Sequence, residues 1–347
     1  MKPTRIIFPA VIFLTLLVVL LLVAACGGGE TTITSKQAAS STTLPTPTVA
    51  GTIAFTKLVA EGDYDICTVN TDGTGLTTIA GGEGCQMSPK WSPDGSQMVF
   101  AESAPGDVDP IDVWVMNADG SGKTQLTNGP IRNWHPTWSP DGTQIAYTSW
   151  LWAHNPQTGE GERAVIMVMN ADGSDAHMVT SDEGEAVDYY PRWAKDGKIY
   201  FCRVDGTGQP TAEYRVNPDG SGLELVMTTG DSHRELLNYE LSPDGEKAAY
   251  QELDNAYRFV DAPAGGGGTA VPLLDPVADY LGTASADAAW SPDGKALAVA
   301  GLADSGSGSG DFGRADFTLL FVVNADGSGL SLVPDIEAVR DPDWRPE

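Results

Sequence analysis

The sequence predicts an all-β fold, a six-bladed β-propeller with four antiparallel strands in each blade. Three observations support this prediction: two turn motifs that recur along the chain, short apolar segments between them, and 40 glycines with 23 prolines in 347 residues. Glycine and proline at this frequency favour many turns and short strands over long helices. Hydrophobic residues make up 41% of the chain, which is enough for a packed core and excludes general disorder.

The first repeated motif is a tryptophan followed by a Ser-Pro-Asp-Gly turn. Complete copies begin at Trp91, Trp138 and Trp290. Weaker copies begin at Trp193 and Leu241, and a shortened copy begins at Trp344. Successive copies start 47 to 55 residues apart. A repeat of this length, built from short strands, is typical of one propeller blade.

The second repeated motif is Asn-x-Asp-Gly, which falls between the copies of the first. Its copies begin at Asn70, Asn117, Asn170, Asn217 and Asn324, and a degraded copy occupies residues 261–265. The apolar segments between the motifs are bounded by Gly, Pro, Asn and Asp, which predicts short strands. Asp-Gly adopts positive φ at little cost and therefore suits tight hairpins. Six units of about 50 residues predict six four-stranded blades over residues 51–347.

The order P-x-W-S-P-D-G, a strand, and then V-M-N-A-D-G resembles the TolB-type, WD-like propeller repeat. The resemblance extends over residues 51–347 and implies that the P-x-W strand is the innermost strand of each blade. Residues 51–55 then correspond to a second strand, and residues 341–344 correspond to an inner strand. We therefore expect the C-terminal inner strand to pair with the N-terminal segment, which closes the ring and leaves no long free edge.

The first 50 residues are expected to direct and tether the protein. Residues 1–25 contain Lys2, Arg5 and a long apolar run, and they end in Val-Ala-Ala before Cys26. This ending resembles the lipobox of bacterial lipoproteins, which implies a signal peptide cleaved before Cys26 and lipidation of that cysteine. An uncleaved membrane anchor is the alternative, and both place the rest of the chain outside the cytoplasm. Residues 26–50 are rich in Gly, Ser, Thr and Pro, which predicts a flexible tether.

The net charge excludes some partners. With 47 acidic against 20 basic residues, the chain carries a formal charge of −27. Such an acidic surface repels phosphate backbones and anionic lipid headgroups, so nucleic-acid binding is not expected. Membrane association is expected through the lipid anchor alone.

No motif predicts catalysis, a metal site or a cofactor. The chain lacks the G-x-S-x-G turn of serine hydrolases, and its four histidines show no metal-ligand spacing. The Asn-x-Asp-Gly turns lack the acids that an EF-hand loop requires. Residues 120–124 lack the first glycine of a phosphate-binding loop.

The position three residues before each repeated Trp, or before Leu241, is the best candidate for a ligand or partner site. The residues at this position are Ser88, His135, Tyr190, Asn238, Asp287 and Asp341, and the neighbours that add aromatic or cationic groups are Trp134, Tyr189, Tyr239 and Arg340. We expect them to surround one mouth of the central channel. The position varies while the Trp is nearly constant, and aromatic and Arg groups are common anchors for partners. The alternative is that they are ordinary loop residues lining a wet channel.

Three cysteines remain after Cys26. An oxidising compartment allows a disulfide, and we expect it to join Cys67 and Cys85. Cys202 lies in an apolar strand and is expected to be a buried thiol.

Together these features predict a monomeric, membrane-anchored, extracytoplasmic propeller that acts as a non-catalytic protein-binding or scaffold module. Its partner would be another protein of the cell envelope. The alternative is a glycan-binding or carbohydrate-active propeller that uses the channel mouth.

Overall fold

The structure is a computed structural model that describes part of the chain. The described residues are 47, 49–60, 63–104, 111–153, 161–181, 186–204, 210–228, 240–251, 257–261, 271–272, 287–302 and 318–346. They all belong to one compact unit, residues 44–347, and residues 1–43 form a separate unit. The predicted signal peptide and most of the tether, with Cys26, lie outside the described residues. Within the described ranges, no helix has the length and apolar character needed to cross a membrane.

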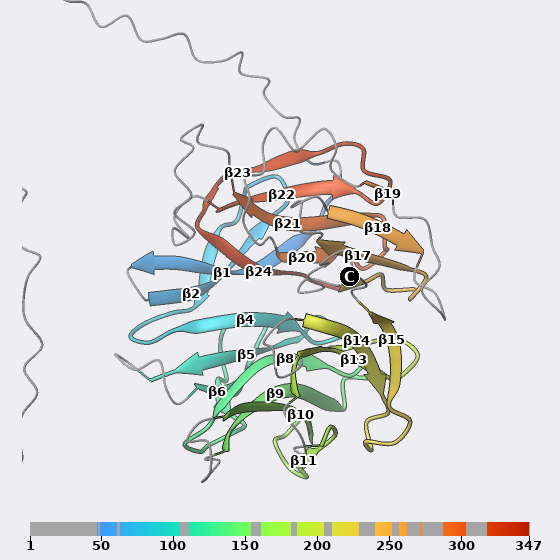
Figure 1. Cartoon of the computed structure of the whole chain (residues 1–347). Helices are drawn as coiled ribbons and strands as arrows, with labels where there is room; N and C mark the ends of the chain where they lie inside the picture. The colour runs from blue at the N-terminus through green and yellow to red at the C-terminus, as the bar shows by residue number, and fades with distance from the viewer. Residues whose placement is uncertain are drawn as a thin grey trace, which may run out of the picture. The chain divides into compact units, whose positions relative to one another are not determined.

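The described residues contain 24 strands, which form six four-stranded antiparallel sheets (Figure 1). The first sheet has the order β24 (Val339–Trp344), β1 (Thr52–Ala60), β2 (Asp63–Asn70) and β3 (Thr77–Ala80). The second contains β4 (Gln86–Trp91), β5 (Gln97–Ser103), β6 (Ile111–Asn117) and β7 (Thr124–Gln125). The third contains β8 (Arg132–Trp138), β9 (Gln144–Ala153), β10 (Gly161–Asn170) and β11 (His177–Met178). The fourth contains β12 (Val187–Trp193), β13 (Ile199–Val204), β14 (Pro210–Val216) and β15 (Glu224–Thr228). The fifth contains β16 (Glu240–Leu241), β17 (Lys247–Gln251), β18 (Tyr257–Asp261) and β19 (Val271–Pro272). The sixth contains β20 (Asp287–Trp290), β21 (Ala296–Leu302), β22 (Thr318–Asn324) and β23 (Ser331–Glu337).

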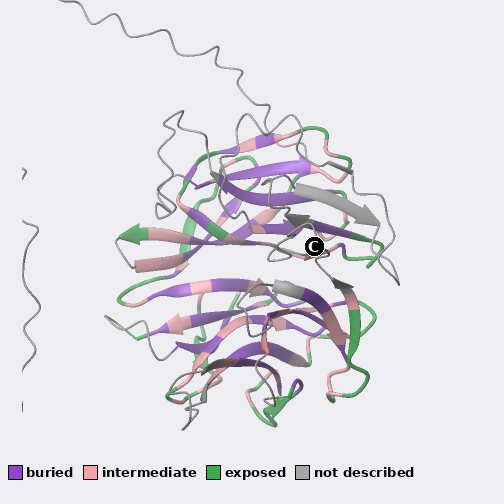
Figure 2. Ribbon diagram, in the orientation of Figure 1, coloured by how far each residue is buried: buried purple, intermediate pink, exposed green. Residues whose placement is uncertain are grey.

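The prediction of an all-β propeller with four antiparallel strands in each sheet is confirmed. The core lies between neighbouring sheets, so both faces of the central strands are buried (Figure 2). In β1, for example, Ile53 and Phe55 pack against β21 and β22 of the sixth sheet. Ala54 points to the other face and packs with Trp91 and Phe100 of the second sheet. Because successive residues of a strand face opposite sides, one strand contributes to two clusters.

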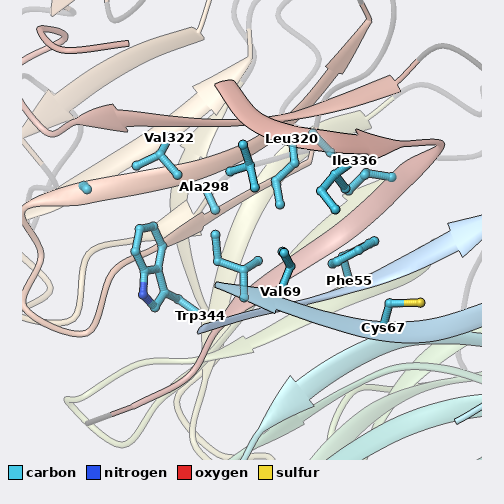
Figure 3. Close-up of a cluster of buried hydrophobic side chains, with 13 residues drawn as sticks. Phe55, Cys67, Val69, Ala298, Leu320, Val322, Ile336 and Trp344 are labelled. Atoms are coloured by element: carbon cyan, nitrogen blue, oxygen red, sulfur yellow. The ribbon is translucent and has the colours of Figure 1, made fainter. Parts of the chain in front are cut away.

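The C-terminal strand completes the first sheet, as the sequence predicts. In β24, Trp344 pairs with Ile53, and Asp343 pairs with Ala54. The Trp344 side chain is 5% exposed and belongs to a cluster that also contains Phe55, Val69 and residues of the sixth sheet (Figure 3). One sheet thus joins the two ends of the described chain.

The two repeated motifs form tight turns, as predicted. In the first Ser-Pro-Asp-Gly copy, the Gly95 N–H donates to the Ser92 carbonyl at 2.8 Å, and the Ser92 hydroxyl donates to Asp94 at 2.6 Å. Gly95 has a φ of 65°, a left-handed value that glycine adopts at little cost. In the Asn-x-Asp-Gly turn, the Gly73 N–H donates to the Asn70 carbonyl at 2.8 Å. The aspartates of both motifs are therefore engaged within their own turns.

Two of the repeated tryptophans link neighbouring sheets through hydrogen bonds. The indole N–H of Trp138 donates to the Lys90 carbonyl of the preceding sheet at 3.2 Å. The indole N–H of Trp290 donates in the same way to the Glu240 carbonyl at 3.0 Å. These bonds satisfy the polar edge of a large buried ring at two of the repeated positions. The indole N–H of Trp193 instead donates to the Gly197 carbonyl of its own turn at 3.2 Å, and that of Trp91 is buried without a partner in the described structure.

The predicted disulfide between Cys67 and Cys85 is wrong. Both residues are buried cysteines that form no disulfide in the structure. Cys67 faces the cluster shared with the sixth sheet, whereas its neighbour Ile66 faces the second sheet. Cys85 precedes β4 of that second sheet, where its N–H donates to the Ser103 hydroxyl at 3.2 Å. The side chain of Cys67 therefore points away from the sheet that holds Cys85. Cys202 is a buried thiol, as predicted.

Candidate functional site

A bulge recurs in the innermost strands. In four of these strands the pairing with the neighbouring strand shifts by one residue. The shift lies between Met87 and Lys90 in β4, between Trp134 and Thr137 in β8, and between Tyr189 and Arg192 in β12. In β24 it lies opposite residues Ala54 and Thr56 of β1. The bulged residues have left-handed φ values: 53° for Ser88, 50° for His135, 56° for Tyr190 and 46° for Asp341. Such values are strained for residues other than glycine, and this strain concentrates at functional sites. These are four of the six positions singled out in the sequence.

The bulged residues line one cavity of about 480 Å³. The first strands of all six sheets contribute to its wall. Of the predicted rim residues, Ser88, His135, Tyr190, Asp287 and Asp341 line this cavity. Asn238 and Tyr239 lie outside the described residues.

The remaining rim candidates lie beside the cavity. Trp134 and Tyr189 support the aromatic residues that follow them in the chain, as described next. Arg340 is exposed and lies over the ring of Tyr64, 5.7 Å from its centroid.

One side of the cavity is aromatic. The rings of His135 and Tyr190 come from neighbouring sheets, and their centroids are 4.0 Å apart. Trp134 lies 5.7 Å from His135, and Tyr189 makes an edge-on contact with Tyr190 at 5.1 Å. The structure thus brings four aromatic rings together from two strands. Contacts of this kind fix the orientation of the rings.

Two carboxyl groups come from another pair of neighbouring sheets. The backbone N–H of Asp341 donates to Asp287 Oδ2 at 3.2 Å. Asp341 Oδ2 accepts from the hydroxyls of Thr56 at 3.2 Å and Ser88 at 3.3 Å. The Ser88 N–H in turn donates to the Thr56 hydroxyl at 3.1 Å. This network fixes the position of the Asp341 carboxylate.

The aromatic and acidic groups share one electrostatic environment. Burial lowers the pKa of His135 to about 4, although Asp341 opposes this shift. Burial and the negative charge of Asp341 raise the pKa of Asp287 to about 7. Burial and the charges of Asp287 and Asp341 raise the pKa of Tyr190. At neutral pH the site therefore holds a neutral imidazole at His135 and, at Asp287, a carboxyl group near its titration midpoint.

The same cavity is also lined by four charged residues that the sequence analysis missed. The position immediately before each repeated Trp, or before Leu241, is occupied by Lys90, Thr137, Arg192, Glu240, Ala289 and Asp343. Four of these six residues are charged, although the strands around them are buried. That contrast is the signal that could have identified them from the sequence.

Two ion pairs involve three of these charged residues, Lys90, Arg192 and Asp343. Lys90 Nζ lies 3.2 Å from Asp343 Oδ1, and the Trp91 N–H donates to Asp343 Oδ2 at 2.7 Å. Burial alone would lower the pKa of Lys90. The negative charges of Asp343 and Glu240 together have the larger effect and raise this pKa. Burial also raises the pKa of Asp343, but Lys90 opposes that rise, so we take the pair as charged at neutral pH. Arg192 pairs with Glu213 of β14, whose side chain is fully buried.

Among the described residues, no cluster of three or more His, Cys, Asp or Glu side chains is arranged to hold a metal ion. The arrangement is suited to binding: a cavity with an aromatic wall, the Asp287–Asp341 carboxyl pair and four further charged residues. A few polar groups placed in a partly apolar concave site are typical of ligand recognition.

Comparison with known proteins supports the fold. Residues 32–157 match the model of the TolB beta propeller domain. The predicted resemblance to TolB-type propeller repeats is thereby confirmed for that part of the chain. No curated protein matches the chain.

Several solved structures have a similar fold. TolB from Acinetobacter baumannii aligns with a TM-score of 0.63 at 19% identity, covering 86% of this chain and 67% of that one. Hydrazine synthase from Kuenenia stuttgartiensis aligns with a TM-score of 0.59 at 15% identity, covering 86% of this chain and 47% of that one. A putative TolB from Agrobacterium tumefaciens aligns with a TM-score of 0.57 at 14% identity, covering 84% and 92%. Identities this low establish similarity of fold and leave the activity to be argued from the site.

Proposed function

We propose that the protein is a lipid-anchored, extracytoplasmic, six-bladed propeller that binds another protein of the cell envelope at its channel mouth, without catalysing a reaction. The anchor is Cys26, after cleavage of residues 1–25, and residues 26–50 tether the propeller. Six four-stranded sheets with the same repeated turns support the blade count. The TolB-type repeat supports an envelope role.

The observation that best supports binding is the contrast between constant and variable positions of the innermost strands. The turn residues and Trp are repeated because each sheet needs them for packing. The bulged position before them carries Ser, His, Tyr or Asp with the same strained backbone. A side chain needed only for folding would be the same type in each repeat. Aromatic residues in a concave site, beside Arg340 at its rim, are typical anchors of a protein partner.

Photo-crosslinking in the native envelope tests this proposal. A photoreactive amino acid replaces His135 in one variant. In the control variant it replaces Leu225, which is 53% exposed in the outer strand β15. We expect the His135 probe to capture one dominant protein that the Leu225 probe does not. Equal capture by both probes, or capture by neither, would contradict the proposal.

Binding of a glycan at the same mouth is the second candidate. It is favoured by the aromatic wall, because aromatic faces beside carboxyl groups suit a sugar ring and its hydroxyls, and the cavity of about 480 Å³ has room for one. Screening envelope glycans against residues 44–347 distinguishes the two. A glycan whose binding is lost when Tyr190 is replaced by Leu would favour this candidate.

A further inference from the structure

We propose that the channel cavity binds an organic cation, an alkylammonium or guanidinium group, between the His135–Tyr190 aromatic pair and the Asp287–Asp341 carboxyl pair. The inference rests on the proposed function of the mouth and specifies the chemistry of what it recognises. The cation belongs to a basic side chain of a protein partner or to a free small amine.

Two cations lie near the carboxyl pair, since Arg340 and Lys90 both oppose the rise in the pKa of Asp287, but neither forms an ion pair with it. Among the described residues, neither Asp287 nor Asp341 forms a salt bridge, because Lys90 is paired with Asp343 and Arg340 lies over Tyr64. The Asp341 network occupies Oδ2, and Asp287 Oδ2 accepts the Asp341 N–H. Within the same part of the chain, the Oδ1 atom of each aspartate accepts no hydrogen bond. Each carboxyl group thus keeps an acceptor for a donor that enters the cavity.

The aromatic pair supplies the complementary half of a cation site. His135 and Tyr190 line the same cavity as the two aspartates. An aromatic ring attracts a cation through the negative potential of its face, and this attraction strengthens in a partly desolvated site. The imidazole is neutral at pH 7, because burial lowers its pKa to about 4, so it does not repel a cation. Its Nδ1 atom is buried and has no hydrogen-bond partner in the described structure.

Organic cations fit this site better than metal ions or anions. A metal ion requires several oxygen or nitrogen ligands at short distance, and no such cluster occurs in the described residues. Aromatic faces beside a carboxyl pair instead suit an organic cation, because the ring faces attract its charge and the carboxyl oxygens accept its N–H groups. The formal charge of −27 raises the local concentration of cations around the protein and repels anions.

Titration calorimetry with defined probes tests this inference. The protein is residues 44–347, which form one compact unit. The cationic probes are N-acetyl-lysine N-methylamide, N-acetyl-arginine N-methylamide and putrescine. The neutral control is N-acetyl-norleucine N-methylamide, which keeps the lysine chain without its charge. We expect the cations to bind at pH 7.5 and low salt, with weaker binding as salt rises, and the norleucine probe to bind at least tenfold more weakly.

Matched variants assign the binding to this cavity. Asp341→Asn removes the charge but keeps an acceptor for Thr56 and Ser88, and we expect it to weaken cation binding about tenfold. Glu337→Gln is the control, since it removes the same charge from an exposed position in β23. Tyr190→Leu should weaken binding severalfold, because it removes the aromatic face. Melting temperatures show whether each variant is folded. Equal affinity for charged and neutral probes, or equal effects of Asp341→Asn and Glu337→Gln, would overturn the inference.

The two proposals fail in different ways. If the His135 probe captures a protein but the cationic compounds do not bind, the cation site is wrong and the partner function stands. If the compounds bind but no protein is captured, the site is right, the partner function is wrong, and a free amine is the source. Tighter binding of the capped lysine or arginine than of putrescine supports the site with a basic side chain as its occupant.

Discussion

Trp344 provides the sharpest test of the architecture, because it closes the first sheet from the far end of the chain. Its side chain is 5% exposed, and its indole packs against Gly51 so closely that a Cβ there would lie 2.2 Å from Nε1. The backbone of Trp344 pairs with Ile53, and the side chain shares a cluster with Phe55 and Val69. Trp344→Ala removes this contact and leaves a cavity between the first and sixth sheets.

The expected cost follows from burial. Replacing a buried Trp by Ala destabilises a protein by about 3–5 kcal/mol, since the lost transfer free energy is joined by the cost of the cavity. The entropy of unfolding is about 2.1 cal/mol/K per residue, or about 0.6 kcal/mol/K for roughly 300 residues. We therefore expect the melting temperature to fall by about 5–8 °C.

Differential scanning calorimetry of residues 44–347 measures this shift. The control is Leu225→Ala, because Leu225 is 53% exposed in β15 and its truncation should change stability by about 0.5 kcal/mol or less. If Trp344→Ala melts within about a degree of both the wild type and this control, β24 does not close the fold and the reasoning is refuted.

Three further predictions concern the channel and the cysteines. Since the pKa of Asp287 is raised to about 7, the folded state binds the carboxyl proton of Asp287 more tightly than the unfolded chain does. The stability that this proton binding contributes is therefore lost as the pH rises from about 4 through 7. Asp287→Asn should therefore melt higher than wild type at pH 8 and equally at pH 4, as measured by thermal scans; a pH-independent difference would contradict this. Arg192→Met should destabilise by about 3–5 kcal/mol in urea unfolding, because it leaves the buried Glu213 without its cation. Adding Glu213→Leu should recover most of that loss, and no recovery would show that the pair acts through packing alone. Cys202 should resist alkylation at pH 8 in the native protein, because it is fully buried and burial raises its pKa to about 12. Mass spectrometry after alkylation in urea without reductant should find three modified thiols in residues 44–347, and a single modified thiol would restore the disulfide.

Much of the fold could be predicted from the sequence because its determinants are local and repeated. The Ser-Pro-Asp-Gly and Asn-x-Asp-Gly turns form through hydrogen bonds within five residues, so their spacing marks the strands. The same logic predicted the pairing of β24 with β1, since the last repeat supplies an inner strand that the first unit lacks.

The candidate site could be predicted only as a set of positions. The varying residue three positions before each repeated Trp identified His135, Tyr190, Asp287 and Asp341 as channel residues. Which of them contact one another depends on how the sheets pack. The cysteine pairing failed for the same reason, because the face to which Cys67 points is set by its neighbouring sheets.

The sequence by itself determined the repeat, the turns, the inner strand and the acidic character of the chain, because each is written in short segments or in composition. Only the tertiary structure decided that Asp341 lies beside Asp287, 54 residues away in the chain, and that the ring of His135 contacts the ring of Tyr190. It also decided that Lys90, Arg192, Glu240 and Asp343 line the same cavity. The physical reason is that these contacts join residues of different sheets, and their distances are fixed by packing between sheets, which no local pattern encodes.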